Sequence, residues 1–129
     1  MKFAFAVLGG TLLVIIGASF LFSKGKPEES LGTPPPLPSS YEYFWGDGCQ
    51  ACAQVQEFFD EWEDMNKVEI DKKEVWYNRG NEKLFKLRGA SCNINQGDLG
   101  VPMLFTPEGE CIIGVNKIKE ELINKVSGS

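Results

Sequence analysis

The sequence predicts an α/β domain in which a four-stranded mixed sheet is flanked by three helices, in the order β-α-β-α-β-β-α. Three observations predict this fold class. A short aromatic run at 41–45 is typical of a buried strand. From Cys49 onward, apolar residues recur at helical spacing. Two short apolar segments near the carboxyl end are joined by a turn signal typical of a β-hairpin.

The first half of the domain contains one strand and one helix. The strand Tyr41-Glu42-Tyr43-Phe44-Trp45 is dense in aromatics, and Gly46-Asp47-Gly48 breaks it. The helix that follows carries an apolar stripe made of Cys52, Val55, Phe58, Phe59, Trp62 and Met65. This stripe predicts a helix with one buried face.

The second half contains the remaining three strands and two helices. A second strand begins at Val68 and runs toward Val75, and Asn78 or Asn81 can cap a helix that ends near Gly89. The last two strands are expected at Val101–Phe105 and Cys111–Val115, before a final helix with Ile118, Leu122, Ile123 and Val126 in its stripe. We expect the first two strands to be parallel, because a helix links them, and the last two to form a hairpin.

Two further segments precede this domain, which we place at residues 41–129. Residues 1–22 contain an uncharged run, Phe3 to Phe22, which as a helix would span about 30 Å and so match a bilayer. We favour a transmembrane anchor, with a cleaved signal peptide as the alternative. Lys2 faces Lys24 and Lys26 across the segment, so its orientation stays open. Residues 23–40 hold five of the seven prolines and predict an extended linker.

The charge balance excludes several function classes. Residues 41–129 contain ten basic and sixteen acidic residues, which argues against binding to nucleic acid. The chain has no histidine, which removes Ser-His and Cys-His catalytic pairs and all metal sites that need imidazole.

The pair Cys49 and Cys52 carries the candidate chemistry. Two cysteines in this spacing at a helix start can form a small-ring disulfide, and the helix dipole favours the thiolate of the first. Cys49 would be the nucleophile and Cys52 the resolving thiol. A zinc ribbon would need a second close pair, but Cys92 and Cys111 are far apart in the sequence. Redox chemistry is therefore favoured over zinc and over a static disulfide.

This strand–turn–dithiol–helix arrangement resembles the thioredoxin superfamily. The resemblance covers nearly all of residues 41–126 and rests on the segment from Phe44 to Cys52 and on Gly100-Val101-Pro102 before a strand. It implies a thioredoxin-like fold, a cis bond before Pro102, and substrate binding by Trp45, Val101 and Pro102. Val101 would pair with the backbone of an extended peptide.

Several residues depart from the family patterns. The compact domain is closer to glutaredoxins, but Trp45-Gly46-Asp47-Gly48 lacks their lysine and Gly114-Val115-Asn116 differs from their later turn, so glutathione binding is doubtful. Tyr43 occupies the position of thioredoxin's buried aspartate. Gln50-Ala51 between the cysteines does not indicate whether the site oxidises, reduces or isomerises disulfides.

Cys92 and Cys111 are candidates for a second disulfide. Two half-buried thiols are the alternative. An exported location would permit the bridge.

The sequence therefore predicts a membrane-tethered thiol–disulfide oxidoreductase that acts on exported proteins, with no cofactor and no metal. We expect an extracytoplasmic domain, secreted if the amino-terminal segment is cleaved, and a membrane redox partner that recycles the dithiol. The alternatives are a non-catalytic binding module of the same fold, or a carrier of Cu(I) or Zn(II) on the two thiolates. Electron-flow direction, substrate and oligomeric state stay open.

Overall fold

The computed structural model describes residues 31–128, in which all the predicted strands and helices of the domain are present. In chain order, the elements of residues 31–128 are β1 (Tyr41–Trp45), α2 (Gln50–Glu61), the 3-10 turn η1 (Met65–Lys67), β2 (Ile70–Glu74), α3 (Arg79–Ser91), β3 (Met103–Phe105), β4 (Cys111–Ile113) and α4 (Val115–Ser127). The predicted anchor, residues 1–22, and the first part of the predicted linker lie outside the described residues. None of the helices within 31–128 has the length and apolar character that a membrane span requires.

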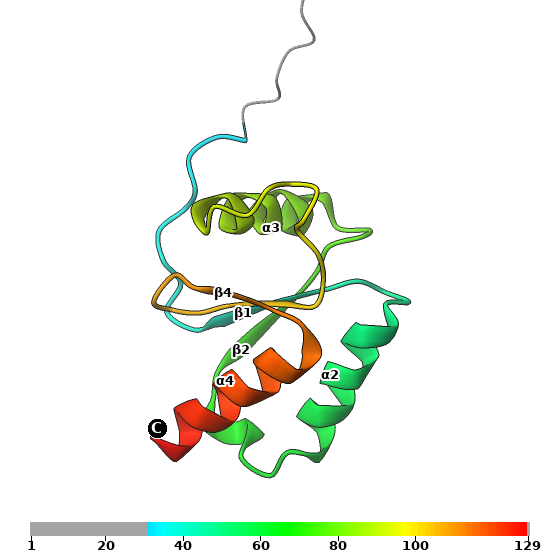
Figure 1. The fold of residues 1–129 in the computed structure, drawn as a ribbon, viewed down its shortest axis with the longest axis vertical. Coiled ribbons are helices and arrows are strands. Elements are labelled where there is room, and N and C mark those ends of the chain that lie inside the picture. The colour runs from blue at the N-terminus through cyan, green and yellow to red at the C-terminus, as the bar shows by residue number, and fades with distance from the viewer. Residues whose placement is uncertain (1–30, 129) are drawn as a thin grey trace, which may run out of the picture. The chain divides into compact units, whose positions relative to one another are not determined.

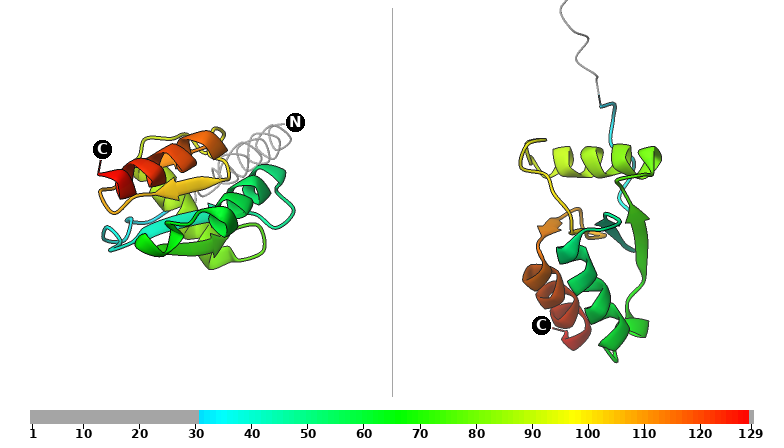
Figure 2. Two further views of the ribbon diagram at one scale, coloured as in Figure 1. Left: turned by 90° about the horizontal axis from the view of Figure 1, so that it is seen from below. Right: turned by 90° about the vertical axis from the view of Figure 1, so that its right-hand side faces the viewer.

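The four strands form one mixed sheet in the order β2-β1-β3-β4. β1 runs parallel to β2 and antiparallel to β3, and β3 and β4 form the expected hairpin. Helix α3 covers one face of the sheet, and α2 and α4 lie together on the other face (Figures 1 and 2). This arrangement confirms the thioredoxin-like fold.

The core has two halves because the side chains of β1 alternate between the faces of the sheet. Tyr41 and Tyr43 point toward α2 and α4, where they pack with Val55, Phe59, Leu104, Ile118 and Leu122. Phe44 points toward α3, where it packs with Val75, Phe85, Met103 and Phe105. The β1 strand is therefore buried on both faces, as its aromatic composition predicted.

Several element boundaries differ from the sequence prediction, among them the start of β3 and the end of α3. Strand β3 begins at Met103 rather than Val101, since Pro102 has no N–H to donate to a strand partner. Helix α3 continues past Gly89 to Ser91, and the chain then turns through Asn93, whose φ is +58°. Gly89 is needed for a different reason: a Cβ there would collide with the side chain of Leu99.

A buried ion pair joins the two sides of the α3 half of the core. Glu42 faces α3, and its carboxylate accepts a hydrogen bond of 2.8 Å from Nε of Arg88. The side chains of Glu42 and Arg88 are only 9% and 4% exposed. The Arg88 guanidinium also lies 4.6 Å from the centre of the Phe105 ring.

Arg88 also holds part of the proline-rich segment against the domain. Its Nη1 and Nη2 atoms each donate a hydrogen bond of 3.0 Å, to the carbonyl oxygens of Pro35 and Pro36. Every arm of the guanidinium is therefore satisfied although the group is buried. The end of the predicted linker is thus in contact with the folded domain.

Replacing Arg88 with Met should destabilise the domain by about 3–5 kcal/mol, because it leaves the carboxylate of Glu42 buried without a partner. Urea unfolding measures this loss. Arg79→Met, at the exposed start of α3, is the matched control and should stay within about 0.5 kcal/mol of the parent protein. The double variant Glu42→Leu/Arg88→Met should recover much of the loss. A cost below about 1 kcal/mol for Arg88→Met would contradict the assignment.

Candidate active site

The two cysteines of the candidate dithiol lie at the amino end of α2. Cys49 is the N-cap residue, with extended backbone, and its Sγ accepts a hydrogen bond of 3.1 Å from the backbone N–H of Cys52. The two residues form a disulfide, and their Cα atoms are 5.2 Å apart. In the reduced protein, that N–H and the positive end of the helix dipole would stabilise a thiolate on Cys49.

The two sulfur-bearing residues differ in exposure. Cys52 is 3% exposed and lies in the core, whereas Cys49 is partly exposed. An incoming molecule therefore reaches Cys49 first. This is the difference that a nucleophile and a resolving thiol require.

The turn before Cys49 positions it through short backbone contacts. The N–H of Cys49 donates a hydrogen bond of 3.1 Å to the carbonyl of Gly46, and Gly48 has a φ of +86°, which favours glycine. Trp76, from the loop after β2, lies over Gly46 so closely that a Cβ there would collide with the indole ring. Gly46 is thus required by a residue thirty positions later in the sequence.

A cavity of about 380 Å³ adjoins the dithiol between β1, the turn, α2 and β2. Trp45, predicted to bind substrate, lines this cavity together with Cys49 and Cys52. Tyr43 also lines it and donates a hydrogen bond of 3.4 Å from its hydroxyl to the carbonyl of Cys52. Burial raises the pKa of Tyr43 well above its ordinary value, so its hydroxyl stays protonated and serves as a donor.

Lys72 is the cation that lines this cavity. Its Nζ donates a hydrogen bond of 2.9 Å to Oε1 of Gln56 and lies 4.9 Å from the centre of the Phe59 ring. Both contacts hold the ammonium on the α2 side of β2. The sequence analysis did not single out Lys72, because only the parallel pairing of Tyr43 with Lys72 brings it to the dithiol.

Glu74 is a second residue that the sequence analysis missed. Its carboxylate accepts hydrogen bonds from the backbone N–H groups of Trp76 at 2.8 Å, Tyr77 at 2.9 Å and Asn78 at 3.1 Å. A further bond of 3.3 Å comes from the N–H of Asp47, in the turn before the dithiol. Desolvation alone would raise the pKa of Glu74, but the four backbone hydrogen bonds together hold it below the ordinary value.

The bond between Val101 and Pro102 is cis, as the resemblance implied. Val101 does not line the cavity beside the dithiol. It lies in a neighbouring pocket that Trp76 also lines, so Trp76 contacts both the turn before Cys49 and the pocket of the cis-proline loop. Trp76 therefore lies between the turn that carries Cys49 and the pocket that Val101 lines. The sequence analysis did not select this residue.

The other two cysteines form a disulfide away from these pockets. Cys92 is the C-cap residue of α3 and Cys111 begins β4, and their Cα atoms are 6.1 Å apart. The bridge encloses the loop that leads to Pro102. Closing a loop of about twenty residues contributes about 3 kcal/mol in the chain-entropy model. Within residues 31–128, no three or more His, Cys, Asp or Glu side chains gather where they could hold a metal ion.

No family model matches the chain, and no curated protein matches it. Among solved structures, the chain is similar to the crystal structure of a buckwheat glutaredoxin–glutathione complex, at 17% identity and a TM-score of 0.46. That match covers 67% of this chain and 70% of the glutaredoxin chain.

The hydrogen bonds of Glu74 predict how stability depends on pH. A carboxylate with a lowered pKa stabilises the folded state above the ordinary glutamate pKa of about 4.3, and this contribution is lost as the pH falls through the folded-state pKa. Glu74→Gln should therefore lower the free energy of unfolding at pH 7 and flatten its decrease in the acid range. Urea unfolding as a function of pH measures this. Glu120→Gln, an exposed carboxylate on α4, is the control. Parallel curves for Glu74→Gln and the parent protein would refute the role.

Proposed function

We propose that this protein is a thiol–disulfide oxidoreductase whose active dithiol is Cys49 and Cys52. The observation that carries the proposal is the pairing of a partly exposed Cys49 at a helix N-terminus with a buried Cys52, in disulfide contact. A disulfide whose only role is structural does not need this difference in exposure. The cavity beside the pair leaves room for a substrate.

The exchange proceeds in two steps and conserves electrons. The Cys49 thiolate attacks one sulfur of a substrate disulfide, forms a mixed disulfide, and releases the other substrate sulfur as a thiolate. The Cys52 thiolate then attacks Sγ of Cys49, which forms the Cys49–Cys52 disulfide and releases the second substrate thiolate. Two electrons pass from the protein to the substrate. Run in reverse, the same steps oxidise a substrate dithiol.

The cis-proline loop is the proposed dock for the substrate backbone. In this proposal, Val101 offers its N–H and C=O to an extended segment next to the substrate cysteine, as in strand addition. Lys72 faces the same cavity as Cys52, and its positive charge would favour the thiolate form there.

The variant Cys52→Ala should trap substrates as mixed disulfides on Cys49, because the resolving thiol is absent. Non-reducing electrophoresis of the full chain, with and without a reductant, measures the adducts. Cys49→Ala is the matched control and should trap little, since Cys52 is 3% exposed. An absence of reductant-sensitive adducts with Cys52→Ala would count against the enzyme and favour a static clasp.

We further propose that the domain is tethered to a membrane and acts on exported proteins. The support is the uncharged run from Phe3 to Phe22 and the proline-rich segment after it. A tether would place the dithiol near a membrane redox partner that recycles it. Expressed full-length protein should stay in membranes after alkaline extraction, and a variant with Leu12 and Ile15 changed to Arg should not. Full release of the unmodified chain would overturn the tether.

A further inference from the structure

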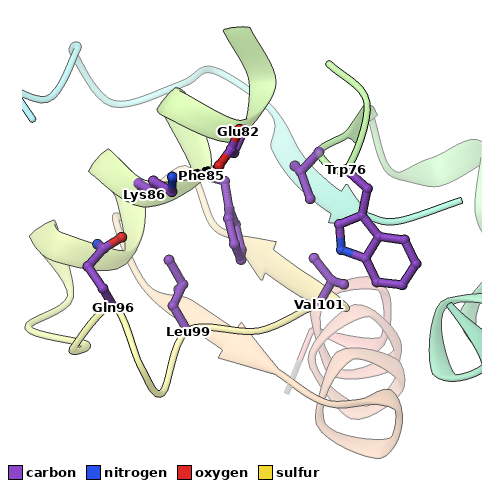
Figure 3. Close-up of a pocket in the computed structure, with 8 residues that line it drawn as sticks. Trp76, Glu82, Phe85, Lys86, Gln96, Leu99 and Val101 are labelled. Carbon is purple, nitrogen blue, oxygen red and sulfur yellow. Dashed lines mark hydrogen bonds and ion pairs between the residues drawn. The ribbon is translucent and has the colours of Figure 1, made fainter. Parts of the chain in front are cut away.

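A second pocket, of about 310 Å³, lies between α3 and the chain that leads into the cis-proline loop (Figure 3). Its apolar lining comes from Val75, Trp76, Phe85, Leu99 and Val101. Trp76 and Val101 lie at one end, Phe85 and Leu99 in the middle, and Lys86 and Gln96 at the other end (Figure 3). The pocket is therefore apolar from the Val101 end to its middle and polar at the end formed by Lys86 and Gln96.

The position of the pocket connects it to the dithiol. Val101, at one end, directly precedes cis-Pro102, and Trp76, beside it, covers Gly46 in the turn before Cys49. Trp76 is 53% exposed, and the adjacent Tyr77 is 79% exposed. Large apolar side chains left exposed at one place indicate a binding surface. A segment that paired with the backbone of Val101 would therefore pass beside this pocket.

The charges of the pocket cancel. Glu82 and Lys86, one turn apart on α3, form an ion pair of 2.6 Å. The remaining polar side-chain groups of the lining, the amide of Gln96 and the indole N–H of Trp76, are neutral. Glutathione carries two carboxylates, and the lining offers them no unpaired cation because Lys86 is paired with Glu82. A lining with no net charge is complementary to an uncharged side chain instead.

We propose that this pocket binds a bulky uncharged apolar side chain, of the leucine or phenylalanine kind, next to the reacting cysteine of an extended protein substrate. The pocket would thereby select polypeptides over glutathione. This inference rests on the proposed oxidoreductase function and specifies its substrate class.

A set of peptides that differ from one another at a single position tests the proposal. Each carries a single cysteine as a mixed disulfide with thionitrobenzoate and has Leu, Phe, Ser, Asp or Lys within three residues of that cysteine. Attack of the reduced Cys49 thiolate on the peptide sulfur releases coloured thionitrobenzoate. The Leu and Phe peptides should react on the order of tenfold faster than the others and than the glutathione mixed disulfide. Equal rates for all peptides, or a faster rate for glutathione, would overturn the proposal.

Variants of the residues that line the pocket distinguish the effect of apolar packing on peptide preference from the effect of charge. Leu99→Ser and Trp76→Ala should each reduce the preference for Leu and Phe several-fold. Glu82→Gln frees the charge of Lys86 and should raise the rates of the Asp peptide and of glutathione at low salt. Glu120→Gln makes the same charge change on α4, away from the pocket, and should leave the ranking of the peptides unchanged. Identical rankings for Glu82→Gln and Glu120→Gln would contradict the charge argument.

A small uncharged disulfide distinguishes the two levels of the proposal. If reduced protein exchanges with the acyclic bis(2-hydroxyethyl) disulfide but not selectively with the peptides, the oxidoreductase function stands and the pocket assignment fails. If it reacts with no disulfide at all, both fail.

Discussion

The strand β1 imposes the constraint on which the rest of the structure depends. It lies inside the sheet, between β2 and β3, so both of its faces must be buried. Alternation sends Tyr41 and Tyr43 to one half of the core and Glu42 and Phe44 to the other. An acidic side chain among them needs a buried counter-ion, which Arg88 supplies. Because Arg88 also binds Pro35 and Pro36, the same constraint brings the proline-rich segment onto the domain.

The dithiol follows the carboxyl end of β1, and the loop after β2 packs against the turn between them. Glu74 binds the backbone of its own loop and of the turn at Asp47, and Trp76 packs on Gly46. These contacts connect the position of Cys49 to the position of Trp76, which also lines the pocket beside Val101. The turn that carries Cys49 and the pocket beside Val101 are thus both in contact with the loop after β2.

Sequence reasoning identified the fold and the dithiol because their signals are local. The aromatic run of β1, the helical stripe after Cys49 and the Val101-Pro102 dipeptide each lie within a few consecutive residues. Sequence reasoning missed Lys72, Glu74 and Trp76, since each is an ordinary residue of a charged strand or its following loop. Their roles arise from pairing β2 with β1, which brings together residues about thirty positions apart. Of the two alternatives for Cys92 and Cys111, a disulfide or two half-buried thiols, the structure contains the disulfide.

By itself, then, the sequence determined the order of the elements and the position of the Cys49–Cys52 pair at the start of a helix, because periodicity and spacing encode backbone geometry over short distances. Only the tertiary structure decided what surrounds that pair. The partners of Glu74, the packing of Trp76 on Gly46 and the cancelled charges of Glu82 and Lys86 in the pocket depend on which segments become neighbours when the core closes. Burial against those neighbours, rather than local propensity, sets the environment of the site.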